Sequence, residues 1–213
     1  EQKRRLAEQK ADDLPRVRLI IEHRRFARDA KGVALNTIES TGRGEVILEL
    51  FEDQAPATVA NFLNLVSQKF YDGTRFHAAE PANLVAGGDP NSKGGDPLKD
   101  GGGGPGYVIA DEFDRPDARG HFRGSLGMGN DARPGTAGCQ FYITFAPNRE
   151  MDGHFTVFGR VIQGQEVIDW ITLGRTNPNV GRFGNIIPGD LLVRAEILRK
   201  RNHEYKVIRL QPK

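Results

Sequence analysis

The chain has 213 residues, of which 38% are hydrophobic and 27% are charged, so it is long enough for one domain with a sizeable core. No apolar run approaches the roughly 18 residues of a membrane-spanning helix, and a single cysteine, Cys139, excludes an internal disulfide framework. The chain begins at Glu1 rather than at a Met and shows no signal-peptide pattern. We therefore interpret it as a processed form or fragment of a longer protein, and its cellular compartment stays open.

Charge is distributed unevenly along the chain. Residues 1–31 carry ten Lys and Arg against six Asp and Glu, and residues 194–213 carry seven against two. The residues between them carry thirteen against twenty. An acidic body with basic ends lacks the basic face that nucleic-acid binding requires, so we expect no nucleic-acid partner. The ends are expected to be solvated basic tails, and contact with an anionic partner or a membrane surface is the alternative.

The N-terminal part of the chain predicts a linker followed by strands. Residues 1–15 combine strong helix formers with almost no apolar stripe, which is typical of a helix or linker with nothing to bury. The cleanest apolar–polar alternation, at 45–51, predicts a strand. Two further strand candidates, 16–22 and 34–38, compete to pair with it. One explanation is an enlarged hairpin over residues 16–44.

Two helices and more strands are predicted beyond this region. Pro56 opens a helix expected over residues 56–70, where its missing N–H is tolerated, and a second helix is expected at 166–173. The glycine-rich stretch 87–106 predicts a long surface loop without the pattern of a phosphate-binding loop. Many short strands with frequent turn signals predict a mainly β barrel or sandwich. The further strand candidates are 107–109, 124–128, 140–145, 156–161 and 191–198.

A series of short motifs follows in a fixed order along the chain. They read ELFEDQAPATVANFLNLV, FYDGTRFH, AGGDP, GGPGY, DEF, RGSLGMGN, AGCQFYITFAP and MDGHFTVFGRVIQGQEVID. Together they resemble the cyclophilin family of peptidyl-prolyl cis–trans isomerases over residues 45–198. The resemblance implies a closed eight-stranded antiparallel β-barrel capped by two α-helices, placed at residues 16–200 between the linker at 1–15 and a basic C-terminal tail at 201–213.

The resemblance also implies a groove that binds a proline-containing peptide or protein segment, with no metal and no cofactor. Residues 76–90 match the family pattern without gaps, so the substitutions can be read directly. Ala78 stands in place of the catalytic arginine, Asn83 in place of a pocket phenylalanine, Leu84 in place of a methionine and Ala86 in place of a glutamine. The other expected groove residues are Gly129, Asn130, Gln140, Tyr142, Met151 and Phe155.

Loss of the arginine leads us to predict a weak prolyl isomerase acting on X–Pro bonds. The alternative is a catalytically inactive module that binds proline-containing segments or serves as a scaffold. Arg75 lies an odd number of residues before Ala78 and so falls on the opposite face of a strand. Arg133 and Arg149 are the better candidates to replace the missing guanidinium. The five histidines show no metal-ligand spacing, so no metal site is expected.

Overall fold

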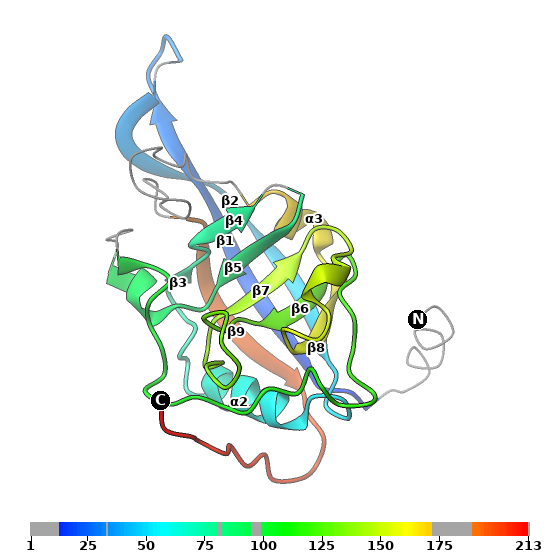
Figure 1. Ribbon diagram of the computed structural model, residues 1–213. Coiled ribbons are helices and arrows are strands. Elements are labelled where there is room, and N and C mark those ends of the chain that lie inside the picture. Colours follow the sequence, from blue (N-terminus) through cyan, green and yellow to red (C-terminus); the bar gives the residue numbers. More distant parts are fainter. Residues whose placement is uncertain (1–12, 33, 81, 95–98, 172–188, 213) are drawn as a thin grey trace.

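The computed structural model describes residues 13–32, 34–80, 82–94, 99–171 and 189–212. The strands in this part of the chain are β1 (Arg16–Arg28), β2 (Ala34–Leu50), β3 (Thr74–Arg75), β4 (Ala78–Glu80), β5 (Leu84–Gly87), β6 (Ser125–Met128), β7 (Phe141–Thr144), β8 (Val157–Gln163) and β9 (Leu191–Arg199). They form one antiparallel sheet in the order β3-β9-β1-β2-β8-β6-β7-β5-β4 (Figure 1). The fold is therefore mainly β, as predicted.

The helix α2 (Pro56–Ser67) packs its apolar side into the core enclosed by the sheet. Phe62 is fully buried, and its ring centroid lies 5.1 Å from that of Tyr71, 5.8 Å from that of Phe141 and 5.2 Å from that of Phe158. Aromatic pairs at these separations and tilted geometries are favourable beyond the area that they bury. This cluster joins the helix to β8 and to β7, which carries Tyr142 of the predicted groove.

Both predicted helices are present with shorter bounds. α2 ends at Ser67 rather than at residue 70, and Lys69 follows with a φ of 56°, a left-handed conformation that cannot continue a helix. The second helix, α3, spans Gln165–Asp169, and residues 172 and 173 of the prediction lie outside the described residues. Two short 3-10 helices, η1 (Pro90–Gly94) and η3 (Arg149–Met151), lie within the connecting loops.

The sheet is not the closed eight-stranded barrel that the sequence predicts. It has nine strands in the described part of the chain, and its edge strands β3 and β4 do not pair with each other. These edges are consecutive in the chain, and the two residues between them bond in opposite directions. The Phe76 N–H donates to the Asp190 carbonyl at 3.0 Å, whereas the His77 N–H donates to the Ala86 carbonyl at 3.0 Å. The segment 74–80 therefore pairs with one edge of the sheet through β3 and with the other through β4. A closed barrel would need hydrogen bonds between two neighbouring strands at this point, and β3 and β4 do not form them.

The strands β1 and β2 form a hairpin whose tip projects from the body (Figure 1). The candidate strand 34–38 is the beginning of β2 rather than a separate strand. The buried Asp190 holds the hairpin where it leaves the body, because its carboxylate accepts from the Arg24 N–H at 2.7 Å and from His23 Nδ1 at 2.8 Å. Residues 16–22 of β1 thus belong to the body of the sheet, where Val17 and Leu19 are buried in the core, and the hairpin beyond His23 forms the projecting arm.

The residues after β9 run across the end of the molecule beside α2, where a solvated tail was expected (Figure 1). The Arg201 guanidinium donates to both carboxylate oxygens of Asp53, at 2.6 and 3.1 Å. The Tyr205 hydroxyl donates to Glu52 at 2.7 Å, and its ring packs against the core. We call residues 200–212 the C-terminal strap.

Candidate functional site

The outer face of four strands carries several predicted groove positions in one row. Strand register places Ala78 opposite Ala86, Ala86 opposite Tyr142, and Tyr142 opposite Gly127. Successive side chains of a strand point to opposite faces of the sheet. The neighbours of this row are buried in the core and point inward; they are Val85, Ile143 and Leu126. The row therefore lies on the outer face of the sheet, where Ala78 and Ala86 are half-buried and Tyr142 is 4% exposed.

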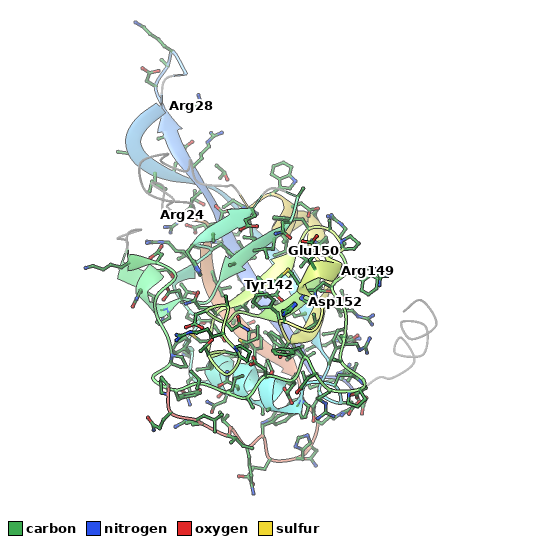
Figure 2. All side chains as sticks on the ribbon, viewed as in Figure 1. Arg24, Arg28, Tyr142, Arg149, Glu150 and Asp152 are labelled. Carbon is green, nitrogen blue, oxygen red and sulfur yellow. The ribbon has the colours of Figure 1, made fainter. Side chains whose placement is uncertain are left out.

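An aromatic and polar cluster surrounds Tyr142, and Figure 2 labels Tyr142 and Asp152 from this cluster. The ring of Phe155 meets the ring of Tyr142 edge-on, with centroids 5.9 Å apart. The ring of His121 stacks on the ring of Tyr142, also with centroids 5.9 Å apart. The Tyr142 hydroxyl lies 2.7 Å from His121 Nε2, and His121 Nδ1 lies 2.7 Å from Asp152 Oδ1. Gly127 is required beneath this ring, because a Cβ there would overlap the phenol.

The direction of the hydrogen bonds in this cluster follows from its chemistry. A carboxylate only accepts, so His121 Nδ1 donates to Asp152 and His121 Nε2 accepts from the Tyr142 hydroxyl. Burial lowers the pKa of His121, although the hydrogen bond to Asp152 opposes the shift. Burial raises the pKa of Tyr142 well above its ordinary value, and the charge of Asp152 adds to the rise. At neutral pH the cluster is thus a neutral imidazole and a neutral phenol held in place by one carboxylate.

The sequence did not reveal His121 and Asp152 as part of the site. The available signal was Tyr142 itself, because a tyrosine buried where a phenylalanine is usual needs a partner for its hydroxyl. The nearest sequence cue is weak, since His121 lies outside the motifs that carry the groove. Only the fold brings its ring to within hydrogen-bonding distance.

The rim next to β5 is tied together through Asn83. Its Nδ2 donates to Glu80 Oε2 at 2.7 Å, and its Oδ1 accepts from Asn148 Nδ2 at 3.0 Å. Asn148 in turn caps η3, because its side chain accepts from the Glu150 N–H. η3 carries Met151, which is half-buried. The amide that replaces a pocket phenylalanine therefore links the β4–β5 turn to the loop that carries Met151.

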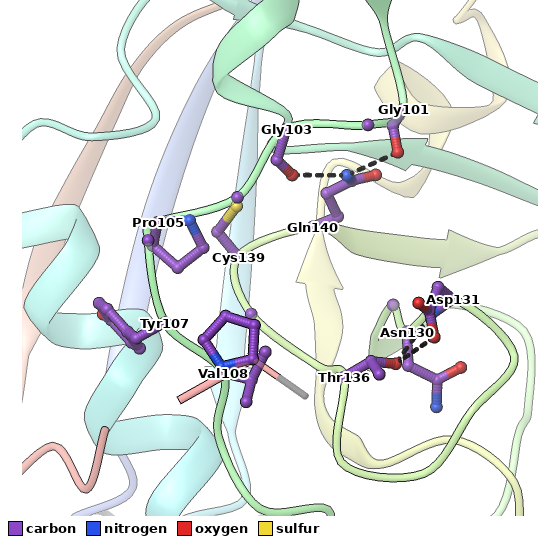
Figure 3. Close-up of a pocket in the computed structure, with 16 residues that line it drawn as sticks. Gly101, Gly103, Pro105, Tyr107, Val108, Asn130, Asp131, Thr136, Cys139 and Gln140 are labelled. Carbon is purple, nitrogen blue, oxygen red and sulfur yellow. Dashed lines mark hydrogen bonds between the residues drawn. The ribbon is translucent and has the colours of Figure 1, made fainter. Parts of the chain in front are cut away.

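The other predicted groove residues line the opposite end of the row. Gln140 Nε2 donates to the carbonyls of Gly101 and Gly103, each at 2.9 Å (Figure 3). The Gly129 N–H donates to the Gln140 carbonyl at 2.7 Å. Asn130 Oδ1 accepts from the backbone of the loop that follows it, and Asn130 Nδ2 donates to the His154 carbonyl at 3.2 Å. These side chains are fixed by the loops around them rather than free in the groove.

A cavity of about 570 Å³ opens beyond Gln140 (Figure 3). Its wall combines the backbone of the glycine-rich loop with the segment that precedes β7. The lining includes Gly103, Pro105, Tyr107, Asn130, Thr136 and Pro212. A smaller cavity of about 260 Å³ lies against Phe155 and Phe113. The row of groove residues is thus flanked by space on the side where Asn130 and Gln140 lie.

The candidate replacement arginines have different surroundings. Arg133 is bound to Asp131 on its own loop at 2.5 Å, and this hydrogen bond lowers the pKa of Asp131 to about 2. Its side chain is 71% exposed. Arg149 is exposed on η3, next to Glu150 (Figure 2), and has no ion-pair partner in the described part of the chain. Arg149 is therefore freer than Arg133 to meet a bound peptide.

Other reactive chemistry has little support in the described residues. Burial raises the pKa of the Cys139 thiol to about 12, so this thiol is not an activated nucleophile at neutral pH. Among these residues no group of three or more His, Cys, Asp and Glu is arranged to hold a metal ion. No helix in the described ranges has the length and apolar character needed to cross a membrane.

Comparison with known proteins gives one consistent result. Residues 35–186 match the family model described as cyclophilin type peptidyl-prolyl cis-trans isomerase/CLD. The chain is 38% identical over 140 residues to peptidyl-prolyl cis-trans isomerase CYP18-1 of Arabidopsis thaliana, covering 65% of this chain and 82% of that protein. It is 37% identical over 142 residues to peptidyl-prolyl cis-trans isomerase-like 1 of Homo sapiens, covering 67% of this chain and 82% of the relative.

A solved structure shares the fold. A cyclophilin type peptidyl-prolyl cis-trans isomerase of Cryptosporidium parvum superposes with a TM-score of 0.64 and 24% sequence identity, covering 88% of this chain and 99% of the other. A second crystal structure of that protein, obtained in the presence of the dipeptide Ala-Pro, gives a TM-score of 0.61 at 24% identity and covers 84% of this chain and 98% of the other.

Proposed function

From the premise that this chain belongs to the family of cyclophilin-type peptidyl-prolyl cis–trans isomerases, we propose that it binds proline-containing segments and isomerises their X–Pro bonds weakly. The observation that carries the proposal is the contrast within one row of the sheet. Tyr142 is held from below by His121 and supported by Phe155, whereas Ala78 and Ala86 face each other with no polar side chain. Tyr142 and Phe155 offer a surface for a proline ring, which we call the floor, whereas Ala78 and Ala86 carry no side-chain hydrogen-bond donor.

The chemistry requires little from the protein beyond selective binding. Rotation about the X–Pro bond must cross a barrier of about 18–20 kcal/mol, because the planar amide loses its resonance as it twists. As it does so, the lone pair localises on the prolyl nitrogen. A site accelerates rotation when it binds this twisted amide more tightly than either planar form. Holding the proline ring against a fixed floor and donating a hydrogen bond near that nitrogen are the two contributions expected.

The fixed floor supplies the first contribution. The Tyr142 ring cannot turn away without breaking its hydrogen bond to His121 or leaving the space over Gly127. A pyrrolidine ring placed against Tyr142 and Phe155 would meet aromatic carbon that is already in position. Preorganised surfaces of this kind lose less side-chain freedom on binding. We therefore expect peptide binding to be retained.

The second contribution is reduced. Ala78 and Ala86 donate nothing from their side chains, and the guanidinium of Arg133 is already bound to Asp131. A hydrogen bond from a charged donor stabilises by about 1.5–3 kcal/mol, so its loss slows the reaction by about tenfold to a few hundredfold. This supports weak rather than full activity. The alternative is a module that binds X–Pro segments without isomerising them, and the exchange experiment below separates the two.

We also propose that the two edges of the sheet stay joined in solution through Phe76 and His77, so that the sheet closes into a barrel at this segment, which we call the seam. The two main-chain hydrogen bonds of this segment, one to each edge of the sheet, support the proposal. Such a seam would keep Ala78 and the adjacent rim at a constant distance from the floor. Slow amide exchange at both residues is the expected sign of it.

Exchange NMR on a tetrapeptide with one X–Pro bond tests the function, because it measures isomerisation and binding in one sample without a coupling protease. We expect saturable binding and a catalysed rate well below that of an ordinary cyclophilin. Phe155→Ala should weaken both, whereas Phe70→Ala, an aromatic truncation just after α2, should change neither by more than about twofold. Binding with no catalysed exchange would select the inactive binding module. No binding would refute the proposal.

A further inference from the structure

The C-terminal strap is fixed to the body at its root by charged and aromatic contacts. Arg201 pairs with Asp53, and the Glu52 carboxylate binds both the Tyr205 hydroxyl at 2.7 Å and His203 Nε2 at 2.5 Å. The rings of His203 and Tyr205 stack with centroids 4.3 Å apart. These contacts determine the direction in which the rest of the strap leaves the body.

The outer part of the strap pairs with the loop that borders the large cavity. Val108 and Leu210 exchange both main-chain hydrogen bonds, at 3.0 and 2.8 Å. The strand predicted at 107–109 is thus reduced to one antiparallel bridge, and its partner is the strap. The Arg209 guanidinium carbon lies 4.9 Å from the centre of the Tyr107 ring, within the range of a cation–π interaction.

These contacts bring Pro212 into the wall of the cavity that also holds Asn130 and Gln140. The cavity retains about 570 Å³ with the strap in place, so the strap walls it without filling it. Burial does not account for this placement, because Ile208 is 66% exposed and Leu210 is 42% exposed. Main-chain pairing and the Arg209 contact position Pro212 instead.

We propose that the C-terminal strap forms part of the peptide-binding surface, where Pro212 contacts a residue that flanks the bound proline. The proposal rests on the proposed function, because a peptide held between Tyr142 and Gln140 is what would carry a flanking residue to this wall. The pyrrolidine ring of Pro212 is rigid and apolar. It therefore favours a bulky apolar flanking residue, aromatic above all, over a small one. Leu210 acts as a positioning residue through Pro212.

Fluorescence anisotropy with labelled hexapeptides tests this role. One peptide has a single proline among alanines; two others add a phenylalanine either two residues before or two residues after the proline. They are titrated into the full chain, into a chain ending at Tyr205, which keeps the root, and into Leu210→Pro, which removes the N–H that donates to Val108. Ile208→Pro is the matched control, because Ile208 is more exposed and takes no part in the bridge.

We expect one of the phenylalanine peptides to bind the full chain and Ile208→Pro equally. It should bind the truncated chain and Leu210→Pro at least fivefold more weakly, while the alanine peptide binds all four within twofold. Amide exchange at Val108 should quicken in the truncated chain and in Leu210→Pro, but not in Ile208→Pro. Equal binding of every peptide to every variant would overturn the role of the strap and leave the proposed function standing, and tighter binding after truncation would overturn it in favour of a lid. If no peptide binds the full chain or the truncated one, the proposed function fails and the strap proposal fails with it.

Discussion

The floor of the groove, formed by Tyr142 and Phe155, and the adjacent β4–β5 edge, formed by Ala78 and Ala86, differ in their polar groups. On the floor, the Tyr142 hydroxyl donates to His121 Nε2, and Asp152 holds the other nitrogen of that imidazole. At the edge, Ala78 faces Ala86, so nothing polar is present and nothing needs a partner. The difference teaches that the surface for a ring and the donor for a twisted amide can be separated within one row of residues. A chain can retain the former while losing the latter.

The sharpest way to break this comparison is to remove the floor. In Gly127→Ala the new methyl group would overlap the Tyr142 phenol, which is held by backbone register and by His121. Overpacking of this kind destabilises by about 1–3 kcal/mol, and we expect peptide binding to fall more than tenfold. Denaturant unfolding and a peptide titration measure both effects. Gly94→Ala is the control, since open space surrounds that position. Unchanged binding in Gly127→Ala would mean that the ring is not the floor.

Filling the edge tests the other half of the comparison. Ala78→Arg alone should raise the isomerisation rate less than about threefold, because a long side chain with up to about 2 kcal/mol of rotamer entropy is left without support. Ala78→Arg with Asn83→Phe and Ala86→Gln should raise it about tenfold, since groups that act as a unit are not additive. Exchange NMR compares the variants on one substrate.

The structure adds a control to that series. Asn83→Phe also removes the hydrogen bonds to Glu80 and Asn148 that hold the rim. The double variant Ala78→Arg with Ala86→Gln keeps this link, so it separates gain at the edge from damage at the rim. A single Ala78→Arg variant that reaches the activity of the triple variant would contradict the view that the edge lacks organisation.

Removing only the polar part of the floor has a smaller effect. Tyr142→Phe keeps the ring but leaves His121 Nε2 as a buried acceptor without its partner. An unsatisfied buried group costs about 1–3 kcal/mol of stability, whereas peptide binding should stay within about threefold. Thermal unfolding and titration measure the two quantities. If binding falls and stability does not, the hydroxyl contacts the ligand directly and the assignment of the cluster to support is wrong.

The main parts of this fold were predictable from local pattern, and the parts that were missed depend on pairing over long distances. Pro56 and the alternation before Phe51 indicated a helix and a strand because their signals lie within a few residues. The Tyr142–His121 bond and the Val108–Leu210 bridge could not be read in this way, because each joins segments that carry no shared pattern. The open sheet differs from the predicted barrel for a related reason, since only the pairing of Phe76 and His77 decides how the edges meet.

The family motifs predicted a set of groove positions but not what surrounds them. Ala86 and Tyr142, two of these positions, lie opposite each other on β5 and β7. The motif could not predict that the Asn83 amide bonds to Glu80 and Asn148. Nor could it predict that the Arg133 guanidinium donates to Asp131. Substituted positions are interpretable only with their new partners, and these lie on loops that the motif does not cover.

The smallest expected effect extends the comparison to the C-terminal strap, which carries the ionisable side chain of His203. The pKa of His203 is raised above its ordinary 6.5, first by its hydrogen bond to the Glu204 carbonyl and then by Glu52, while the charge of Arg201 opposes the rise. A raised pKa in the docked state means that docking is favoured below pH 6.5 and loses this contribution as the pH rises through the raised value.

We therefore expect the chemical shifts of Leu210 and Val108 to move toward undocked values across that window, in the full chain titrated by NMR. His203→Gln should flatten this dependence, and Glu52→Gln should lower the pKa of His203. Because His203 is on the surface, the change should be modest and should shrink in high salt. The floor provides the internal reference, since the His121 pKa is lowered by burial and its neighbours should not titrate in the same window. A strap that docks equally at all pH values would place its stability in the Arg201 and Val108 contacts alone.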